Sequence, residues 1–329
     1  MQANHGSDVM DELLQVRVAA KRVVADGIVA FDLMPLEGRS LPSFEAGAHI
    51  DVQVPSGPVR QYSLYELPGA THRYRIGVLR EPQSRGGSVK LIDTVKEGDV
   101  IAVSPPRNHF PLEPTAEKSV LLAGGIGITP LLCMAQQLAH EDRDFELHYC
   151  GRTVDRMAFL ENLRQSPYAD RVQVHVDDGP REQQLDARAV IGAPTGGTHL
   201  YVCGPTGFMD HVLQTARSLG WDETHLHREY FAAAPIDHSA DGPFELELKK
   251  TGRVIRIAAD QSAAQALLDA GVDLSLSCEQ GVCGTCLTTV VAGVPDHRDL
   301  YLTDAEHERN DRFTPCCSRA RTPRLVVDL

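Results

Sequence analysis

The chain has 329 residues, of which 42% are hydrophobic and 23% are charged, proportions typical of a folded globular protein with two or three domain cores. Its formal net charge of −13 is spread along the sequence and argues against nucleic acid as a partner. No apolar run reaches the roughly eighteen residues of a membrane span, and residues 1–11 lack a secretion signal, so we expect a cytoplasmic protein.

The first predicted domain spans residues 12–114 and is an antiparallel β-barrel. Short β-like runs follow one another there and are broken by Gly and Pro, which is typical of a small barrel. A single helical stretch, Ser88–Val95, interrupts them. The predicted strands are Leu14–Val24, Val29–Pro35, His49–Val54, Val59–Tyr65, Tyr74–Leu79 and Val100–Pro105.

Two motifs inside this barrel indicate a flavin that carries a phosphate. Arg60 and Tyr62 share one face of a strand that also contains Ser63. A guanidinium matches phosphate oxygens, and a tyrosine ring can lie on a flavin ring system. Where the predicted helix begins, bare N–H groups and glycines permit the close approach of a phosphate. This second motif consists of Arg85, Gly86, Gly87 and Ser88. Each motif alone is common in ordinary strands and turns, but together they favour one phosphate site.

The second predicted domain, residues 115–231, is an α/β domain with a parallel sheet, because its runs alternate between strand and helix periods. A glycine-rich turn, Gly124–Pro130, leads from a strand into a helix, and the loop Cys203–Met209 follows a later strand. Turns of this kind bind nucleotides, although the first lacks the GxGxxG spacing and glycine is common at all such turns. The predicted strands are Ser119–Ala123, Phe145–Cys150, Val172–Val176, Leu200–Cys203 and Thr224–Glu229. One predicted helix follows the glycine-rich turn and ends at about His140, and two others cover Ala158–Arg164 and Pro205–Gly220.

Residues 232–242 are rich in Ala, Pro, Asp, Ser and Gly and are predicted to be a linker. The third predicted domain, residues 243–329, is a compact α+β module. Its predicted elements are a hairpin of Phe244–Lys249 and Arg253–Ala258, a helix over Ala263–Ala270, a strand over Leu287–Val291, a helix near Asp304–Glu308 and a strand over Arg324–Val327.

Cysteines in this last domain carry the most specific signal in the chain. Three of them follow a C-x4-C-x2-C pattern, and a fourth comes from an adjacent pair near the C-terminus; they are Cys278, Cys283, Cys286 and either Cys316 or Cys317. Four such thiolates are what a plant-type [2Fe–2S] cluster requires. The two glycines inside the run fit this interpretation, because the loop must wrap closely around two irons.

Structural zinc and a disulfide pair are the alternatives to the cluster. Zinc knuckles favour paired C-x2-C units, and this domain has only one such unit. Cysteines elsewhere lie in apolar surroundings that are typical of buried thiols. The pattern therefore favours the iron–sulfur cluster.

The order of these motifs resembles the phthalate dioxygenase reductase family, which includes the vanillate O-demethylase reductases, over nearly the whole chain. The segments His227–Phe231 and Pro295–Asp299 add to the resemblance. It implies an FMN-binding β-barrel, an NADH-binding α/β domain and a plant-type ferredoxin domain of the β-grasp fold. It also implies electron transfer from NADH through FMN and the [2Fe–2S] cluster to a Rieske non-haem iron oxygenase. We expect the chain to act as a monomer.

The same resemblance implies a set of contact residues. The implied flavin contacts are Arg60 and Ser88 at the phosphate, Tyr62 at the ring, Ser63 near the flavin N5 and Phe231 at the other face, with Gly86 and Gly87 in the phosphate cradle. The implied nucleotide contacts are Gly125, Gly127, Thr129, Cys203, Gly204 and Pro205. The implied fourth cluster ligand is Cys316, and Cys317 packs beside it. A cation at Arg152 could contact a 2′-phosphate, which would favour NADPH.

A flavin would solve a mismatch between the two other cofactors, because a nicotinamide gives two electrons as hydride and the cluster accepts one at a time. Hydride transfer needs no general base, and we assign none. His225 and His227 are predicted to be surface or packing residues rather than ligands. A reductase for a cytochrome P450 or another haem acceptor is the alternative within redox chemistry. A sensing module in which the cluster reports redox state without catalysis is the alternative outside it.

Overall fold

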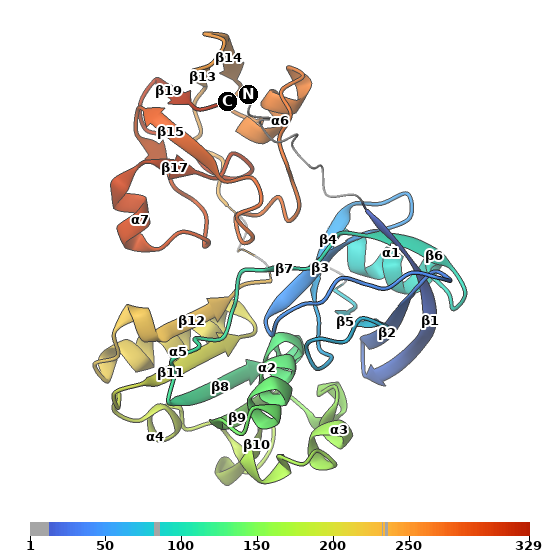
Figure 1. Ribbon diagram of the computed structural model, residues 1–329. Helices are drawn as coiled ribbons and strands as arrows, with labels where there is room; N and C mark the ends of the chain where they lie inside the picture. Colours follow the sequence, from blue (N-terminus) through green and yellow to red (C-terminus); the bar gives the residue numbers. More distant parts are fainter. Residues whose placement is uncertain (1–12, 82–85, 232, 234–235) are drawn as a thin grey trace, which may run out of the picture. The chain divides into compact units, whose positions relative to one another are not determined.

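The computed structural model describes residues 13–81, 86–231, 233 and 236–329, which divide into two compact units (Figure 1). The first unit, Met1–Glu229, contains the β-rich and α/β segments, and the second, Tyr230–Leu329, contains the cysteine run. The predicted linker, residues 232–242, lies partly outside the described residues. Among the helices that the structure describes, none is long and apolar enough to cross a membrane.

A seven-stranded antiparallel sheet forms the barrel of the first unit, coloured blue to cyan in Figure 1. Its strands are β1 (Leu14–Ala25), β2 (Ile28–Pro35), β3 (Ala48–Gln53), β4 (Val59–Ser63), β5 (Tyr74–Leu79), β6 (Val100–Val103) and β7 (Arg107–Asn108), and helix α1 covers Gly87–Thr94. Neighbouring strands follow the order β4-β3-β6-β1-β2-β5, and β7 pairs with β3. A bridge between Leu64 and Ile76 joins the two ends of this order, so the sheet closes on itself.

The interior of the barrel is apolar because side chains alternate across its strands. Phe31, Leu33, Ile50 and Tyr74 are fully buried. The hydroxyl group of Tyr74 donates a hydrogen bond to the carbonyl oxygen of Pro42 at 2.7 Å, so its polar end is satisfied inside the core. The predicted barrel is confirmed, and only the two-residue strand β7 is too short to give a sequence signal.

Five parallel strands form the second layer of the first unit. They are β8 (Lys118–Gly124), β9 (Asp144–Gly151), β10 (Val172–Val176), β11 (Thr198–Cys203) and β12 (Leu226–Glu229), with helices α2 (Ile128–His140), α3 (Leu160–Arg164), α4 (Ala187–Ile191) and α5 (Thr206–Ser218). The strand order is β10-β9-β8-β11-β12, so the winding direction reverses between β8 and β11. Ligands of doubly wound sheets bind at the carboxyl ends of the strands where this reversal occurs.

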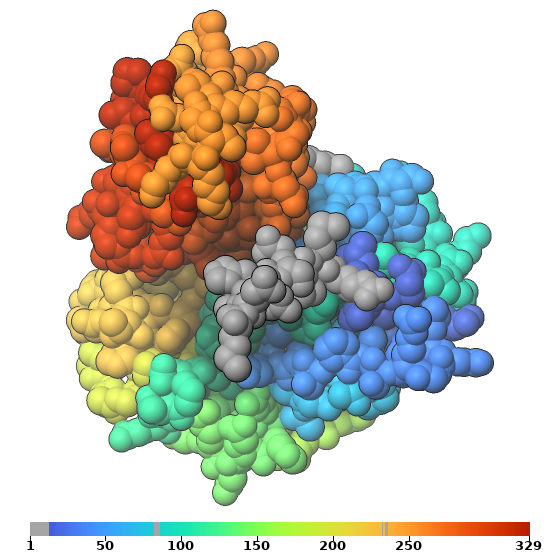
Figure 2. Space-filling model, turned by 45° about the horizontal axis from the view of Figure 1, so that its top comes forward, coloured from blue at the N-terminus to red at the C-terminus, as the bar shows by residue number. Residues whose placement is uncertain are grey.

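Helix α2 joins the parallel sheet to the barrel. Nine of its thirteen residues are buried. The Gln136 side chain donates a hydrogen bond to the carbonyl oxygen of Tyr65 at 2.7 Å, and the Cys133 thiol donates to the carbonyl oxygen of Glu66 at 3.0 Å. The barrel and the sheet are therefore parts of one unit, and their blue and green surfaces adjoin in the space-filling view (Figure 2).

The second unit is an α+β module of the β-grasp type. Its strands are β13 (Phe244–Leu248), β14 (Val254–Ile257), β15 (Thr288–Ala292), β16 (Pro295–Asp296), β17 (Arg312–Phe313), β18 (Arg319–Ala320) and β19 (Arg324–Val327), and its helices are α6 (Ala263–Asp269) and α7 (Asp304–Arg309). The main sheet has the order β14-β13-β19-β15-β17, in which the first and last strands of the unit pair in parallel. Leu246, Leu267, Phe313 and Leu325 are fully buried in its core. The predicted α+β module is confirmed.

Histidines of the parallel sheet pack against one another. The ring of His227 lies on the ring of Tyr201, with centroids 4.5 Å apart, and its Nε2 is 2.9 Å from Nδ1 of His199. Burial lowers the pKa of His227 to about 4, so its imidazole is neutral at pH 7. The prediction that this histidine packs is confirmed.

Candidate functional site

The barrel meets the parallel sheet at the carboxyl ends of the parallel strands. Ser63, at the end of β4, donates a hydrogen bond from Oγ to Oε2 of Glu229, at the end of β12, over 3.1 Å. On β5, a Cβ added to Gly77 would lie 2.9 Å from Cγ2 of Thr129 in helix α2. Two barrel strands therefore reach the edge of the sheet at which a nucleotide is expected.

The two predicted nucleotide loops touch each other through their backbones. A Cβ added to Gly127 would lie 2.3 Å from the carbonyl oxygen of Cys203, and one added to Gly204 would lie 2.9 Å from Cα of Gly124. No side chain fits at these contacts, so both positions require glycine. The loops after β8 and β11 thus form one continuous backbone surface, and Pro205 follows directly as the residue that precedes helix α5.

The start of helix α1 lies beside the guanidinium group of Arg60. A Cβ added to Gly87 would be 2.7 Å from Nε of Arg60, and Gly86 before it has a φ of 85°, in the left-handed region that favours glycine. A cation next to the N–H groups of a helix start suits an anion such as a phosphate. Ser88, predicted at the cap, lies inside the first turn, and its hydroxyl accepts a hydrogen bond from the N–H of Glu81 at 3.2 Å.

Tyr62 carries a polar atom that no described residue satisfies. Its hydroxyl group is buried and has no hydrogen-bond partner among the residues that the structure describes. Burial also raises its pKa, so the group stays protonated and able to donate. A buried hydroxyl without a partner is rare in proteins and fits a bound ligand at this point of the barrel. Arg85, predicted nearby, lies outside the described residues.

Glu229 is a functional candidate for which the sequence alone predicts no role. Burial raises the pKa of its carboxyl group to about 8, while the hydrogen bond from Ser63 opposes this shift. The carboxyl group is therefore neutral at pH 7. The nearby thiol of Cys203 is fully buried, which raises its pKa well above the usual value and keeps it protonated. The junction thus presents neutral groups. In the sequence, only the position of Glu229 at the end of the last parallel strand could have indicated its role.

The other predicted contacts are placed as follows. Thr129 is buried, and its hydroxyl donates a hydrogen bond to the carbonyl oxygen of Ile126 at 3.1 Å. Gly125 has a φ of 54° in the turn before helix α2. Arg152 is exposed after β9. Phe231 belongs to the second unit, where its side chain is 41% exposed. The roles assigned to these residues stay predictions.

The second unit gathers four thiols in one place. Contacts with the thiols of Cys283 and Cys316 lower the pKa of Cys278 and raise the pKa values of the two other thiols. The thiol of Cys316 also contacts that of Cys286. Four sulfur donors within reach of one another suit a metal centre that binds thiolates.

Backbone geometry in the cysteine loop supports the same chemistry. The N–H groups of Gln280 and Thr285 point at sulfur, at 3.4 Å from Sγ of Cys278 and Cys283 respectively. Such N–H donors stabilise thiolates and tune the reduction potential of a cluster. Within the run, the two glycines adopt positive φ angles of 72° and 70°, which agrees with the tight loop that the sequence predicts.

Cys317 has different surroundings from its neighbour. It is buried, its Sγ is 3.2 Å from Oγ1 of Thr314, and a Cβ added to Gly281 would lie 2.4 Å from that sulfur. Cys317 therefore packs against the base of the loop, whereas Cys316 contacts two of the three loop cysteines. This difference favours Cys316 as the fourth ligand.

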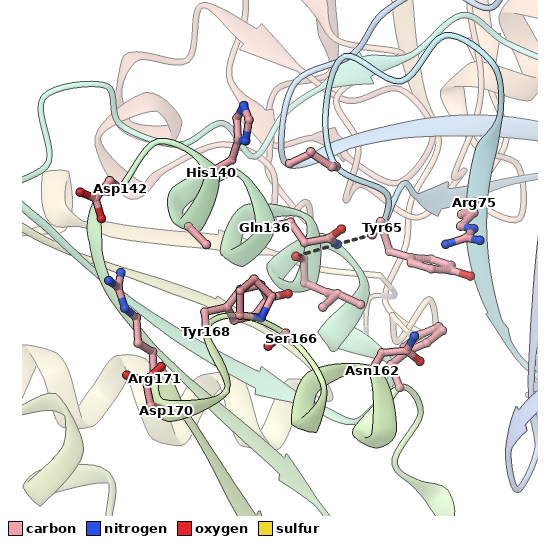
Figure 3. Close-up of a pocket in the computed structure, with 15 residues that line it drawn as sticks. Tyr65, Arg75, Gln136, His140, Asp142, Asn162, Ser166, Tyr168, Asp170 and Arg171 are labelled. Carbon is pink, nitrogen blue, oxygen red and sulfur yellow. Dashed lines mark hydrogen bonds between the residues drawn. The ribbon is translucent and has the colours of Figure 1, made fainter.

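A cavity of about 750 Å³ lies between the barrel and the second half of helix α2 (Figure 3). It is lined by Tyr65 and Arg75 from the barrel, by Gln136 and His140 from the helix, and by the segment 166–171. Residues predicted to bind flavin or nucleotide do not line it. This cavity is therefore separate from the strand ends at which the predicted contacts gather.

Two family models match the chain. The model of the 2Fe-2S iron–sulfur cluster binding domain matches residues 246–321, which include all four predicted ligands. The model of the dimethylamine monooxygenase subunit DmmA-like N-terminal domain matches residues 100–226. The first match lies within the second unit, and the second match lies within the first unit.

Whole-chain similarity extends to curated proteins and to solved structures. The vanillate O-demethylase oxidoreductase of Pseudomonas sp. (strain HR199 / DSM 7063) is 54% identical over 317 residues, which cover 96% of this chain and 100% of that protein. The structure of phthalate dioxygenase reductase, a modular structure for electron transfer from pyridine nucleotides to [2Fe-2S], is 39% identical with a TM-score of 0.75 and covers 97% of this chain and 98% of its own. An intact type IV self-sufficient cytochrome P450 monooxygenase is 35% identical with a TM-score of 0.85, over 99% of this chain and 43% of that one.

Proposed function

The chain belongs to the family of the vanillate O-demethylase oxidoreductases and phthalate dioxygenase reductases, and we propose from this membership that it serves a Rieske-type non-haem iron oxygenase or O-demethylase. It is an oxidoreductase that passes electrons from a pyridine nucleotide through a flavin to a 2Fe–2S centre. The observation that carries the proposal is the presence of four converging thiols in the same chain as a barrel with an unsatisfied buried hydroxyl. We further propose that it acts as a monomer.

The flavin is FMN in this proposal, held at the barrel. Arg60 and the start of helix α1 bind the phosphate, with Gly86 and Gly87 allowing its close approach and Ser88 beside it. Tyr62 provides a buried hydroxyl donor for which the described part of the chain offers no partner. When bound, the flavin supplies the conversion of one hydride into single electrons.

NADH binds along the backbone surface formed by the loops after β8 and β11 in this proposal. The contacts are Gly125, Gly127, Thr129, Cys203, Gly204 and Pro205. Ser63 and Glu229 lie where the barrel reaches this surface, so they orient the nicotinamide and the flavin ring toward each other. Phe231 stays a predicted cover of the flavin.

The cluster ligands in this proposal are Cys278, Cys283, Cys286 and Cys316. Their mutual contacts and the N–H donors at two of the sulfurs support the assignment.

We expect the rate of flavin reduction by NADH to fall as the pH rises through about 8. Above this pH, the Glu229 carboxyl group ionises. Its negative charge would then lie near the position proposed for hydride transfer and would oppose the arrival of a hydride at the flavin. In Glu229→Gln, which keeps a neutral side chain, the rate should stay constant over this range. Stopped-flow absorbance between pH 6 and 9 measures both.

The raised pKa of Glu229 also affects how the stability of the first unit depends on pH. The folded-state pKa of Glu229 lies above its unfolded value of 4.5, so its stabilising contribution is present below pH 4.5 and is lost as the pH rises toward 8. Glu229→Gln should remove this part of the pH dependence of the urea midpoint. If the variant retained the wild-type pH profiles of both rate and stability, the role proposed for Glu229 would be refuted.

The acceptor is tested by comparison, because the similarity to a P450 fusion favours a haem acceptor as the second candidate. With NADH present, we expect the chain to reduce a Rieske-type oxygenase faster than a bacterial cytochrome P450, measured from the absorbance of each acceptor. Faster reduction of the P450 would favour the second candidate. Chromatography of the released flavin should give FMN, and recovery of FAD would contradict the phosphate site at Arg60.

A further inference from the structure

Three metal-binding side chains lie together in the second unit, apart from the cysteines. His297 and Asp299 follow strand β16, and His307 lies on helix α7. Nδ1 of His297 is 3.8 Å from one carboxylate oxygen of Asp299, and Nε2 of His307 is 3.3 Å from the other. One potential ligand atom from each residue lies within 4.8 Å of the other two.

His297 is the feature of this cluster that ordinary packing does not explain. Its side chain is 7% exposed, and neither ring nitrogen has a well-formed hydrogen bond among the described residues, although the side chain of Asn310 lies close enough to raise the pKa of the ring. Its ring stacks on that of His307, with centroids 4.3 Å apart. An imidazole with so little exposure and neither nitrogen well paired would gain from a ligand that its lone pair can bind.

Asp299 is held in a fixed orientation. Its carboxylate accepts hydrogen bonds from the N–H of Leu302 at 2.8 Å and from the hydroxyl of Ser318 at 3.4 Å, and its side chain is fully buried. Hydrogen bonds of this kind orient the ligands of metal sites. Asp299 also packs against the cysteine loop, because a Cβ added to Gly281 would lie 3.0 Å from it.

We propose that His297, Asp299 and His307 bind a divalent transition-metal ion of the zinc class, in a site separate from the cysteines. Two imidazoles and one carboxylate are a usual ligand set for Zn²⁺, with bonds of about 2.0–2.2 Å that separate tetrahedral ligands by about 3.3 Å. The separations of 3.3 and 3.8 Å involve different oxygens of Asp299, and the three ligand atoms lie within 4.8 Å of one another, so the two imidazoles must move closer to one ion to reach this geometry. The side chain of His307 is 24% exposed, and a water molecule would supply the fourth ligand.

The charges around the cluster agree with a bound cation. Burial and the ring of His307 lower the pKa of His297, which disfavours a second positive charge on the ring. A divalent ion would place its charge beside the buried carboxylate of Asp299.

The test uses the full-length, iron-replete protein, with one equivalent of Zn²⁺ added and the excess removed. X-ray absorption at the zinc edge should show only nitrogen and oxygen ligands, at about 2.0–2.2 Å. Sulfur ligands at about 2.3 Å would mean that zinc occupies the cysteines, and that result would overturn the proposal. Failure of the protein to retain zinc would overturn it as well.

Variants locate the ion. His307→Ala should weaken zinc affinity by at least about 100-fold in competition with a chromogenic chelator, because it removes one of three protein ligands. His307→Gln should do the same while retaining a donor to Asp299, which separates ligand loss from misfolding. His72→Ala removes an exposed histidine of the first unit and should leave the affinity unchanged. Wild-type affinity in both His307 variants, with the cluster absorbance intact, would refute the site.

Discussion

Cys283→Ser should abolish electron output to cytochrome c while reduction of the flavin by NADH continues. Cys283 is buried, and its sulfur takes part in the hydrogen-bonded set of thiols and accepts from the N–H of Thr285. A hydroxyl is a far weaker iron ligand than a thiolate, so the cluster should not assemble. Loss of a group that only orients a metal ligand lowers metal affinity or activity by about 10–100-fold. Because Cys283 is itself a proposed ligand, we expect the rate of cytochrome c reduction to fall by at least about 100-fold.

Three measurements check this result. The visible absorbance of the cluster and the rate of cytochrome c reduction should fall together. The single-turnover rate of flavin reduction should stay at the wild-type value, because the flavin contacts proposed on the barrel lie in the first unit, and Cys283 lies in the second. Retained output in Cys283→Ser would remove the cluster from the electron path.

Cys317→Ser is the matched control for this variant. Cys317 is an equally buried cysteine of the same unit, and Thr314 and Ser318 offer a serine hydroxyl hydrogen-bond partners in its place. The cluster should assemble in Cys317→Ser and fail in Cys316→Ser. The reverse result would exchange the two residues as the fourth ligand.

Much of the fold could be predicted from the sequence, because each unit has its own periodicity. The glycine and proline breaks predict the barrel, and the alternation of strands and helices predicts the parallel sheet. What the sequence could not give is the pairing of β13 with β19, which joins the first and last strands of the second unit. Strands this far apart in the chain pair because both bury apolar faces in one core, and local patterns carry no record of that.

The residues of the candidate site also fall into those that a local sequence pattern predicts and those that only the fold brings together. The cysteine run is a local signal with fixed spacing, so the sequence alone predicts its chemistry. Glu229 becomes a candidate only when folding brings Ser63 to within 3.1 Å of its carboxyl group, across a large separation in the chain. The two histidines of the proposed zinc site are likewise separated by a helix cap and a turn, without a spacing that is typical of zinc sites.

Arg319→Ala should strongly destabilise the second unit. The side chain of Arg319 is 7% exposed and donates hydrogen bonds to the carbonyl oxygens of Gln261, Gly242 and Ala258, each at 2.9 Å. It also forms an ion pair with Asp241, at 3.5 Å, whose own side chain is 2% exposed.

Removal of this guanidinium group leaves three carbonyl groups and part of the charge of Asp241 without a partner. Breaking a buried pair on one side costs about 3–5 kcal/mol, and for a unit of this size each kcal/mol lowers the unfolding temperature by about 4–8 °C. We therefore expect the loss of cluster absorbance on heating to occur at least about 12 °C lower than in the wild type. The cation also lies over the ring of Phe244, at 5.2 Å from its centroid, which adds to the loss.

Arg324→Ala is the matched control, since it removes the same charged group from the same unit. Arg324 forms ion pairs with Glu245 and Glu247, but its side chain is 45% exposed, so water and salt screen both pairs. Exposed pairs of this kind contribute little to stability, and the unfolding temperature of this variant should stay close to that of the wild type. Equal shifts in the two variants would mean that burial of the cation at Arg319 contributes nothing, because exposure is the property in which the two arginines differ most.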